Sequence, residues 1–232
     1  MSFDALAPWY GSLEWIAFGD QLQRCRTACL AELPSPQRAL IVGEGNGKFL
    51  CALLRMHPGV EVDCVDASAR MLDLARERIQ KELPGRLERV RFWQEDIRSW
   101  KPPEQGYDLI VTHFVLDCFP EEQLAAVVQN LARAGTNDAV WLLADFCIPE
   151  EGANRWRARI WLAVMYKFFR VTTGIDATEL IDPTPFMQAE GFKGRQCVTA
   201  DPTNGGYKPP FLDASRSSFG GMLKSQIWRK HR

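Results

Sequence analysis

Three glycines stand within five positions directly after a run of apolar residues, in the stretch ALIVGEGNGKFL. Glycines between a strand and a helix let the backbone turn tightly and approach a ligand, and the amide groups of the helix point at whatever is bound. The spacing distinguishes between ligands. In the dinucleotide fingerprint GxGxxG counted from Gly43, the third glycine position is taken by Lys48. The phosphate loop GxxxxGK[ST] also fails, because the count is wrong and Phe49 replaces the hydroxyl residue.

Two acidic residues follow at the ends of the next two strand candidates. Asp66 ends the run VDCVD, and a carboxylate in that place can accept hydrogen bonds from both hydroxyls of a ribose. Asp96, in WQEDI, can accept a hydrogen bond from an exocyclic amine such as that of adenine, with Ile97 as an apolar platform. It can equally be the N-cap of a short turn. A ribose acid without a pyrophosphate fingerprint indicates a nucleoside-type cofactor.

Strands and helices must position these residues. Between Arg38 and Ile148, short apolar runs alternate with segments that have helical periodicity. Such alternation is typical of βαβ units and a mostly parallel sheet, whose ligands bind at the carboxyl ends of the strands. A later pair of strands joined by a Pro/Gly-rich loop predicts an antiparallel hairpin that closes the sheet edge. We expect strands over 38–43, 60–66, 89–96, 107–116, 139–146, 194–201 and 221–230, and helices over 48–59, 68–83, 120–135 and 183–192.

The chain predicts a single domain over residues 1–232, made of four segments. Residues 1–35 form an N-terminal helical cap that ends at the prolines of LPSP. Residues 36–148 form the cofactor-binding core, residues 149–182 an inserted helical lid, and residues 183–232 a C-terminal helix and strand hairpin.

The inserted segment holds a helix with a wide apolar face and several basic residues. Three interpretations of this helix stay open: packing of the apolar face against the body of the domain, a lid over an apolar substrate, and association with a membrane surface. The residues that share the apolar face are Trp156, Ile160, Trp161, Val164 and Phe168, and the charge comes from Arg155, Arg159, Lys167 and Arg170.

The composition argues against several classes of function. Lys and Arg number 28 against 29 for Asp and Glu, so no overall field would attract a polyanion and we expect no nucleic-acid partner. Seven cysteines occur without a CxxC pair or zinc spacing, so we expect no metal and mostly reduced core cysteines. No apolar stretch approaches the roughly 20 residues of a membrane span, and the first residues lack a basic signal region. We expect a cytoplasmic protein, of an oligomeric state that the sequence does not indicate.

Together these features resemble the class I S-adenosylmethionine-dependent methyltransferases, over Arg38 to Ile148. The family's glycine motif aligns with LIVGEGNG, its ribose acid with Asp66 in VDASARML, its adenine-contacting acid with Asp96 in QEDI, and its fourth motif with YDLIVTHFVLDCF. The resemblance implies an α/β fold, a Rossmann-like, doubly wound sheet of seven strands with an antiparallel last strand, and S-adenosylmethionine as the cofactor. The cofactor contacts that it implies are Gly43, Glu44, Gly45, Gly47, Asp66, Ala67, Met71, Glu95, Asp96, Ile97, Thr112, His113 and Tyr10.

One position departs from the family pattern. The family usually has an acid two residues before the first glycine, where this chain has Ile41. Glu44, inside the turn, is the nearest carboxylate. We expect it either to reach the amino group of the cofactor and replace the missing acid, or to be a solvated turn residue.

Methyl transfer from a sulfonium depends on the position of the acceptor more than on acid and base groups, although an acceptor hydroxyl is helped by a base within hydrogen-bond reach. Weak candidates for such a base, each of which could instead be structural, are His113, Asp117 and Asp145. The aromatic residues Trp9, Trp156 and Trp161 favour a small, partly apolar or aromatic acceptor, and THFVLDCF lacks the Pro-Pro pattern of DNA amino-methyltransferases.

Two alternatives to a methyltransferase remain. The chain could be a binding module on the methyltransferase scaffold that does not catalyse, since Ile41 interrupts the usual motif. It could also be an NAD-dependent oxidoreductase, against which Lys48 argues.

Overall fold

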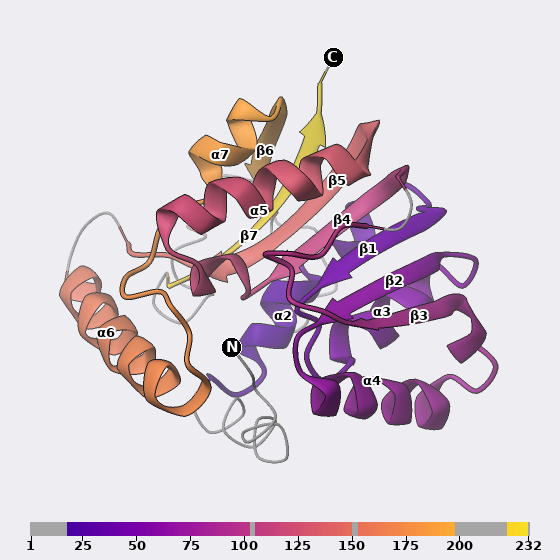
Figure 1. Cartoon of the computed structure of the whole chain (residues 1–232), viewed down its shortest axis with the longest axis horizontal. Coiled ribbons are helices and arrows are strands. Elements are labelled where there is room, and N and C mark those ends of the chain that lie inside the picture. The colour runs from indigo at the N-terminus through magenta and orange to yellow at the C-terminus, as the bar shows by residue number, and fades with distance from the viewer. Residues whose placement is uncertain (1–17, 103–104, 150–152, 198–221, 232) are drawn as a thin grey trace, which may run out of the picture.

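A seven-stranded sheet forms the centre of the protein in the computed structural model, which describes residues 18–102, 105–149, 153–197 and 222–231 (Figure 1). β1 to β5 run parallel to one another, whereas β7 is antiparallel to both β5 and β6. The expected mostly parallel sheet with an antiparallel last strand is confirmed. The strands are β1 (Arg38–Val42), β2 (Glu61–Asp66), β3 (Val90–Gln94), β4 (Tyr107–His113), β5 (Gly135–Phe146), β6 (Phe192–Gln196) and β7 (Leu223–Lys230), in the order β3-β2-β1-β4-β5-β7-β6.

Helices cover both faces of the sheet because successive side chains of a buried strand point to opposite faces. In β1, Ile41 packs in a cluster with α3 (Lys48–Met56) and α4 (Ala69–Glu82), whereas Leu40 packs in a cluster with α5 (Glu121–Ala134) and α7 (Thr184–Ala189). Figure 1 shows α5 and α7 in front of the sheet and α3 behind it. The alternation of strands and helices expected over the core is confirmed.

Several boundaries differ from those expected. β4 ends at His113 instead of Leu116, because Phe114 has a positive φ of 55° that a strand does not accommodate. A short 3₁₀ helix, Leu116–Cys118, follows. Of the expected N-terminal cap, the described part contains α2 (Gln21–Thr27) and a 3₁₀ helix, Leu30–Glu32, and residues 1–17 lie outside the described residues. A third 3₁₀ helix, Leu87–Arg89, precedes β3.

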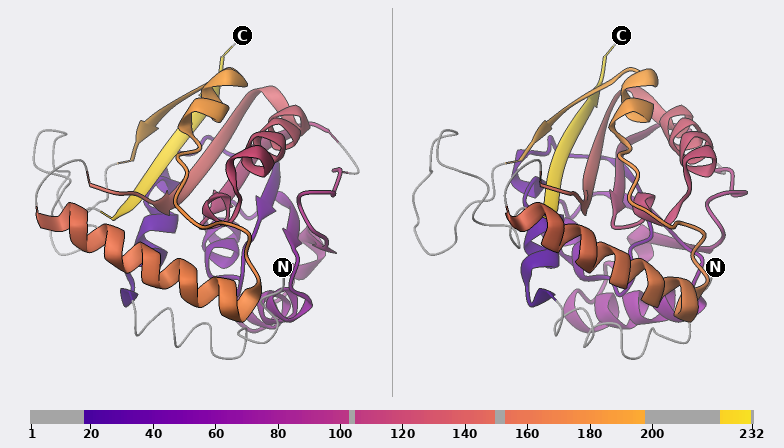
Figure 2. Two further views of the ribbon diagram at one scale, coloured as in Figure 1. Left: turned by 60° about the vertical axis from the view of Figure 1, so that its left-hand side comes forward. Right: turned by 90° about the vertical axis from the view of Figure 1, so that its left-hand side faces the viewer.

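The inserted helix is α6 (Ala153–Thr173), which lies beside the carboxyl end of β5 (Figures 1 and 2). Its buried side chains Leu162, Met165 and Tyr166 pack in a third cluster with Phe146 of β5 and Leu22 of α2. Among the residues that the structure describes, no helix combines the length and the apolar character needed to span a bilayer.

The expectation that the aromatic face of α6 packs against the body of the domain is wrong. Trp156, Ile160, Trp161, Val164 and Phe168 are all exposed. The physical reason is that α6 is apolar on two sides, and the smaller, less conspicuous set of Ala158, Leu162 and Met165 is the one that the domain buries. Periodicity locates an apolar face but does not say which of two such faces points inward.

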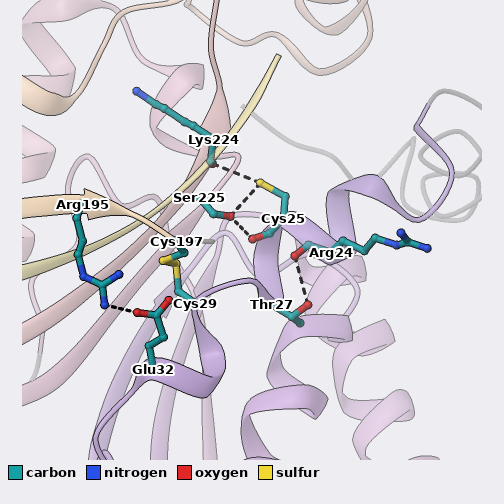
Figure 3. The surroundings of a disulfide bond; sticks show 9 residues. All are labelled: Arg24, Cys25, Thr27, Cys29, Glu32, Arg195, Cys197, Lys224 and Ser225. Carbon is teal, nitrogen blue, oxygen red and sulfur yellow. Dashed lines mark hydrogen bonds and ion pairs between the residues drawn. A yellow bond between two sulfur atoms is a disulfide. The ribbon is translucent and has the colours of Figure 1, made fainter. Parts of the chain in front are cut away.

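A disulfide joins Cys29, beside the first 3₁₀ helix, to Cys197, directly after β6 (Figure 3). It is an exception to the expectation that the cysteines are mostly reduced core residues, which Cys25, Cys51 and Cys64 meet, since they are free and buried. The pairing was not visible in the sequence because 168 residues separate the two cysteines, and only the fold brings their Cα atoms to 5.4 Å. A disulfide is typical of an oxidising compartment, so the cysteines no longer support a cytoplasmic location.

Polar contacts reinforce this connection between the first helices and the last two strands. Arg195 of β6 forms an ion pair with Glu32, and the Sγ of Cys25 donates to the carbonyl oxygen of Lys224 of β7 at 3.3 Å (Figure 3). Ser225 donates to the carbonyl oxygen of Cys25. The N-terminal helices are therefore held at the β6–β7 end of the sheet by covalent and polar contacts together.

Candidate functional site

A cleft opens at the carboxyl ends of β1, β2 and β4, the edge of the sheet at which ligands of such folds bind. About 660 Å³ of space free of protein atoms lies within the cleft and its open mouth, a volume that includes solvent at the mouth. The lining residues are Val42, Gly43, Gly45, Val65, Asp66, Ala67, Met71, Glu95, Asp96, Ile97, Phe114, Val115, Cys118 and Phe119.

The three glycines of the loop after β1 have three different tasks. A Cβ on Gly43 would lie 2.8 Å from a methyl carbon of Val115, so this glycine allows the loop after β4 to come close. A Cβ on Gly47 would lie 2.8 Å from the Cα of Ala75 in α4, and its φ of 82° is left-handed. A Cβ on Gly45 would meet no protein atom within 4 Å, and this residue lines the cleft. Gly47 thus serves helix packing, while Gly45 leaves space for a ligand.

Asp66 joins the glycine loop to the start of α4. One of its carboxylate oxygens accepts a hydrogen bond from the N–H of Gly45 at 3.2 Å, and the other accepts from the N–H of Ser68 at 2.9 Å. Ser68 in turn caps α4, because its hydroxyl accepts from the N–H of Met71 at 3.2 Å. A carboxylate offers about four acceptor positions, so Asp66 can hold the loop and face the cleft at the same time.

Asp96 begins the short turn that was expected as one of its roles. Its carbonyl oxygen accepts from the N–H groups of Ser99 and Trp100 at 3.0 and 2.9 Å, and its carboxylate pairs with the guanidinium of Arg98. That guanidinium lowers the pKa of the Asp96 carboxyl below its ordinary value. Asp96 also lines the cleft beside Ile97, so a contact with an exocyclic amine remains a prediction that its position allows.

Glu44, the acid inside the turn, is buried and turns toward α3. Its Oε1 accepts a hydrogen bond from the N–H of Leu50 at 2.9 Å, in the first turn of that helix. Burial raises the pKa of its carboxyl to about 7, against the lowering effects of the Leu50 N–H and the charge of Arg26. The expectation that Glu44 is a solvated turn residue is therefore wrong, since it is only 8% exposed.

The structure brings eight of the expected cofactor contacts together in the cleft and places others elsewhere. Thr112 is fully buried, and its hydroxyl accepts from the indole N–H of Trp141 in β5 at 2.8 Å. His113 is buried with its ring edge-on to Phe49, at 4.5 Å between centroids. Neither lines the cleft, and neither do Glu44 or Gly47. Tyr10 and the expected substrate contact Trp9 lie outside the described residues.

Sequence reasoning missed the segment after β4 as a wall of the cleft. Phe114, Val115, Cys118 and Phe119 all line it. Phe114 is the one non-glycine residue with a positive φ in the described part of the chain, and such backbone conformations concentrate at functional sites. The fourth motif of the family pointed to this stretch, but nothing marked its apolar residues as ligand contacts, because apolar residues after a strand resemble core residues.

A line of aromatic rings connects this wall to α6. Ring centroids lie 5.1 Å apart between Phe114 and Phe146, 5.7 Å between Phe146 and Phe18, and 6.0 Å between Phe18 and Trp161 of α6. The guanidinium of Arg26 lies 5.3 Å from the centroid of Phe114. Phe114 in the cleft wall is therefore the first ring of a packed series of aromatic contacts that reaches α6.

The three candidate bases are all buried, with different electrostatics. Burial and the charge of Arg26 lower the pKa of His113 well below its ordinary value, so its ring is neutral. Burial raises the pKa of Asp117 to about 6, and burial and then the charge of Asp117 raise that of Asp145 well above its ordinary range. One oxygen of Asp145 accepts from the N–H of Phe146 at 2.8 Å. Elsewhere, among the described residues, no group of acids, cysteines and histidines is placed to hold a metal ion.

Comparisons with known proteins agree with this geometry. A family model described as a methyltransferase domain matches residues 39–138, which contain the glycine loop and both acids of the cleft. The trans-aconitate 2-methyltransferase of Azoarcus sp. is 30% identical over 162 residues, which is 66% of this chain and 60% of that protein. The match to the protein of the same name from Rhodopseudomonas palustris covers 39% of its length, so this chain spans between about two fifths and three fifths of these curated relatives.

Solved structures show the same fold at lower identity. The structure of a mitomycin 7-O-methyltransferase matches 100% of this chain and 61% of its own with a TM-score of 0.66 at 16% identity. Human N-acetylserotonin methyltransferase, solved in complex with S-adenosylmethionine, matches 97% of this chain and 56% of its own with a TM-score of 0.62 at 13% identity. Residues 39–138, which carry the cleft, therefore belong to a methyltransferase domain, and the seven-stranded fold is that of the class I S-adenosylmethionine-dependent methyltransferases.

Proposed function

We propose that the chain transfers a methyl group from S-adenosylmethionine to a small, partly apolar or aromatic acceptor. The observation that carries the choice of acceptor is the line of rings from Phe114, in the wall of the cleft, to Trp161 on α6. An acceptor in the cleft would contact the rings of Phe114 and Phe119 in its wall, and aromatic faces and edges favour flat apolar molecules. The relatives do not favour the alternatives of a non-catalytic module or an NAD-dependent oxidoreductase.

The residues of the cleft fit the cofactor of the family. Gly45 leaves open the space that a Cβ would fill, and we propose that the ribose hydroxyls bind Asp66. Met71 and Ile97, both buried, lie on the cleft wall as apolar surfaces for the adenine, with Asp96 as the acceptor for its amine. When bound, the cofactor supplies a methyl group on a positively charged sulfur. The chain then has to orient an acceptor in line with that group and exclude water.

A base is needed only where the acceptor carries a proton that must leave. Of the three candidates, Asp117 suits this task best, because a pKa of about 6 keeps its carboxylate ionised at neutral pH. Burial lowers the pKa of His113 well below its ordinary value and raises that of Asp145 well above its ordinary range, so neither suits the task as well. Asp117 lies next to Cys118, which lines the cleft.

Thermal stabilisation by ligands tests the cofactor directly. S-adenosylmethionine and its demethylated product are expected to raise the melting temperature, and NAD is not, because only a ligand that binds the folded state stabilises it. A panel of acceptors then tests the substrate class. Phenols and other small aromatic hydroxyl compounds are expected to be methylated at higher kcat/KM than trans-aconitate, the acceptor named for the curated relatives.

A variant of the inserted helix tests the acceptor region. Trp161→Ala is expected to lower kcat/KM for an aromatic acceptor about 10-fold, the effect of losing one aromatic contact of ordinary strength. The matched control is Val164→Ala on the exposed side of the same helix, which is expected to leave kcat/KM unchanged for a soluble acceptor. Preference for trans-aconitate, or equal activity of both variants, would contradict the aromatic acceptor while leaving methyl transfer intact.

A further inference from the structure

α6 carries a second apolar face that points away from the described core. Its exposed side chains range from 43% exposure for Phe168 to 82% for Val171, and Trp156, Ile160 and Val164 lie between them. In a helix with 3.6 residues per turn, positions 156, 160, 164 and 171 fall on one stripe, opposite the buried Leu162 and Met165. The right-hand view of Figure 2 shows α6 lying across the side of the molecule nearest to the viewer.

The charged residues of α6 are all of one sign. From Ala153 to Thr173 the helix contains five of the chain's 28 Lys and Arg residues and none of its 29 Asp and Glu residues. The rest of the chain is therefore net negative, and the positive charge is concentrated on this helix. Arg159, Lys167 and Arg170 are exposed, and none of them forms an ion pair with another described residue.

We propose that this face of α6, defined by Trp156, Ile160, Val164, Phe168 and Val171, with Lys167 among them and Arg159 and Arg170 along one flank, docks on an anionic membrane surface. Exposed apolar side chains, tryptophan and a basic flank together are the composition of helices that lie in the plane of a lipid interface. The helix would lie on the membrane with its apolar side chains among the headgroups. Such peripheral docking requires no helix that spans the bilayer.

Charge decides between a membrane and a second copy of the chain. Two α6 helices packed face to face would bring Arg159, Lys167 and Arg170 of one copy toward the same three cations of the other, and α6 itself supplies no acid to separate these like charges. Anionic lipid headgroups complement the same cations and accept the apolar side chains between them. The surface therefore fits a bilayer better than it fits itself. This proposal does not depend on the proposed methyl transfer.

Vesicle flotation with the full chain tests the proposal. Binding to vesicles of phosphatidylcholine with phosphatidylglycerol is expected to be at least ~10-fold tighter than binding to phosphatidylcholine alone, and to weaken as salt screens the cations. The double variant I160E/V164E is expected to lose at least ~10-fold of the binding, because charged side chains are costly within the interface. Replacing Arg159 and Arg170 by Gln is expected to remove mainly the preference for the anionic vesicles.

Met56→Glu provides the matched control, since Met56 is an exposed apolar residue at the end of α3 and is 49% exposed. It is expected to bind vesicles like the wild type, and circular dichroism shows whether each variant is folded. Absence of vesicle binding by the wild type, or equal binding by I160E/V164E, would overturn the proposal. The proposal would also be overturned if light scattering shows that the wild type is a dimer and that I160E/V164E is a monomer. This face would then be a contact between two copies of the chain.

Discussion

The carboxylate of Glu44 and the backbone N–H of Leu50 are joined by a hydrogen bond of 2.9 Å, so the acid inside the glycine turn holds the first turn of α3 from the loop side. The first N–H groups of a helix have no partner within it, and a carboxylate also suits the positive end of the helix dipole. Glu44 therefore stabilises the strand-to-helix turn on which the cleft is built. Glu44 was also expected to contact the amino group of the cofactor. Substitutions of Glu44 distinguish that role from the stabilisation of the turn.

Glu44→Gln is expected to change the affinity for S-adenosylmethionine by less than about 2-fold, because the amide oxygen can still accept from Leu50, whereas loss of a charge-assisted hydrogen bond costs 10-fold or more. Calorimetric titration of the variant and the wild type measures the difference. Glu44→Ala is the companion variant and is expected to lower the free energy of unfolding by about 1–2 kcal/mol through the lost cap. A 10-fold weaker cofactor affinity of Glu44→Gln would restore Glu44 as the substitute for the acid missing at Ile41.

The pH dependence of stability follows from the raised pKa of Glu44. Between its ordinary value of 4.5 and the folded value of about 7, the folded chain keeps a proton that the unfolded chain has lost. The free energy of unfolding therefore falls as the pH rises through this window, by at most about 3 kcal/mol from this group. Glu44→Gln is expected to gain stability relative to the wild type between pH 4.5 and pH 8, measured by urea unfolding. If the free energies of unfolding of the two proteins differ by the same amount at every pH in this range, Glu44 is not a buried group that ionises in the folded chain.

Two glycines of one loop are expected to respond differently to the same substitution. Gly47→Ala places a Cβ 2.8 Å from the backbone of Ala75, at a φ of 82°, so it is expected to lower the free energy of unfolding by about 2–3 kcal/mol. Gly45→Ala is strained by its φ of 70° but meets no protein atom, so it is expected to cost about 1 kcal/mol and to weaken cofactor binding instead. Denaturant unfolding and cofactor titration on both variants separate the two effects. If Gly45→Ala and Gly47→Ala lose the same cofactor affinity when compared at the same fraction of folded protein, Gly45 does not face the ligand.

Asp66→Asn is expected to weaken binding of S-adenosylmethionine at least ~10-fold, since the amide replaces a charged acceptor for the ribose by a neutral one. The fold is expected to persist, because the remaining oxygen can still accept from the N–H of Gly45 or Ser68. Asp73→Asn serves as the control, because Asp73 is an exposed acid on α4 that pairs with Arg76. Cofactor affinity of Asp66→Asn equal to that of the control would remove Asp66 from the binding site.

The disulfide between Cys29 and Cys197 is expected to stabilise the oxidised chain by about 2–4 kcal/mol relative to the reduced chain, because it constrains a long loop in the unfolded state. Urea unfolding with and without reductant measures this difference. Cys29→Ser is expected to be insensitive to reductant, and Cys51→Ser, which alters a free buried cysteine, is expected to keep the sensitivity. If the wild type unfolds identically under both conditions, the bond does not contribute to stability.

The parallel core could be predicted because short strand candidates alternate with helices of a clear period. The glycine loop, Asp66 and Asp96 could be located because a sheet of this kind places its ligand at strand ends. The wall formed by Phe114 and Phe119 could not, since apolar residues after a strand resemble core residues.

Other features depend on contacts that the sequence does not encode locally. The disulfide of Cys29 joins residues that only the fold brings together. The direction of Glu44 was not predictable, because a buried acid and a solvated acid in a turn have the same sequence signature. The apolar face of α6 was located correctly, but of its three interpretations packing against the domain is wrong, since two apolar faces on one helix differ only in their tertiary surroundings.

The position of β7 between β5 and β6 also sets an order of assembly. In the described sheet, β6 pairs with β7 alone, so on a ribosome β6 emerges before the strand that gives it its hydrogen bonds. The first five strands can pair while synthesis continues, whereas β6 and the Cys29–Cys197 bond must wait until β7 has entered the sheet. Until β7 pairs with β5, one edge of β5 has no strand beside it. An unpaired strand edge is a site of aggregation, so the nascent chain is most vulnerable just before β7 enters the sheet.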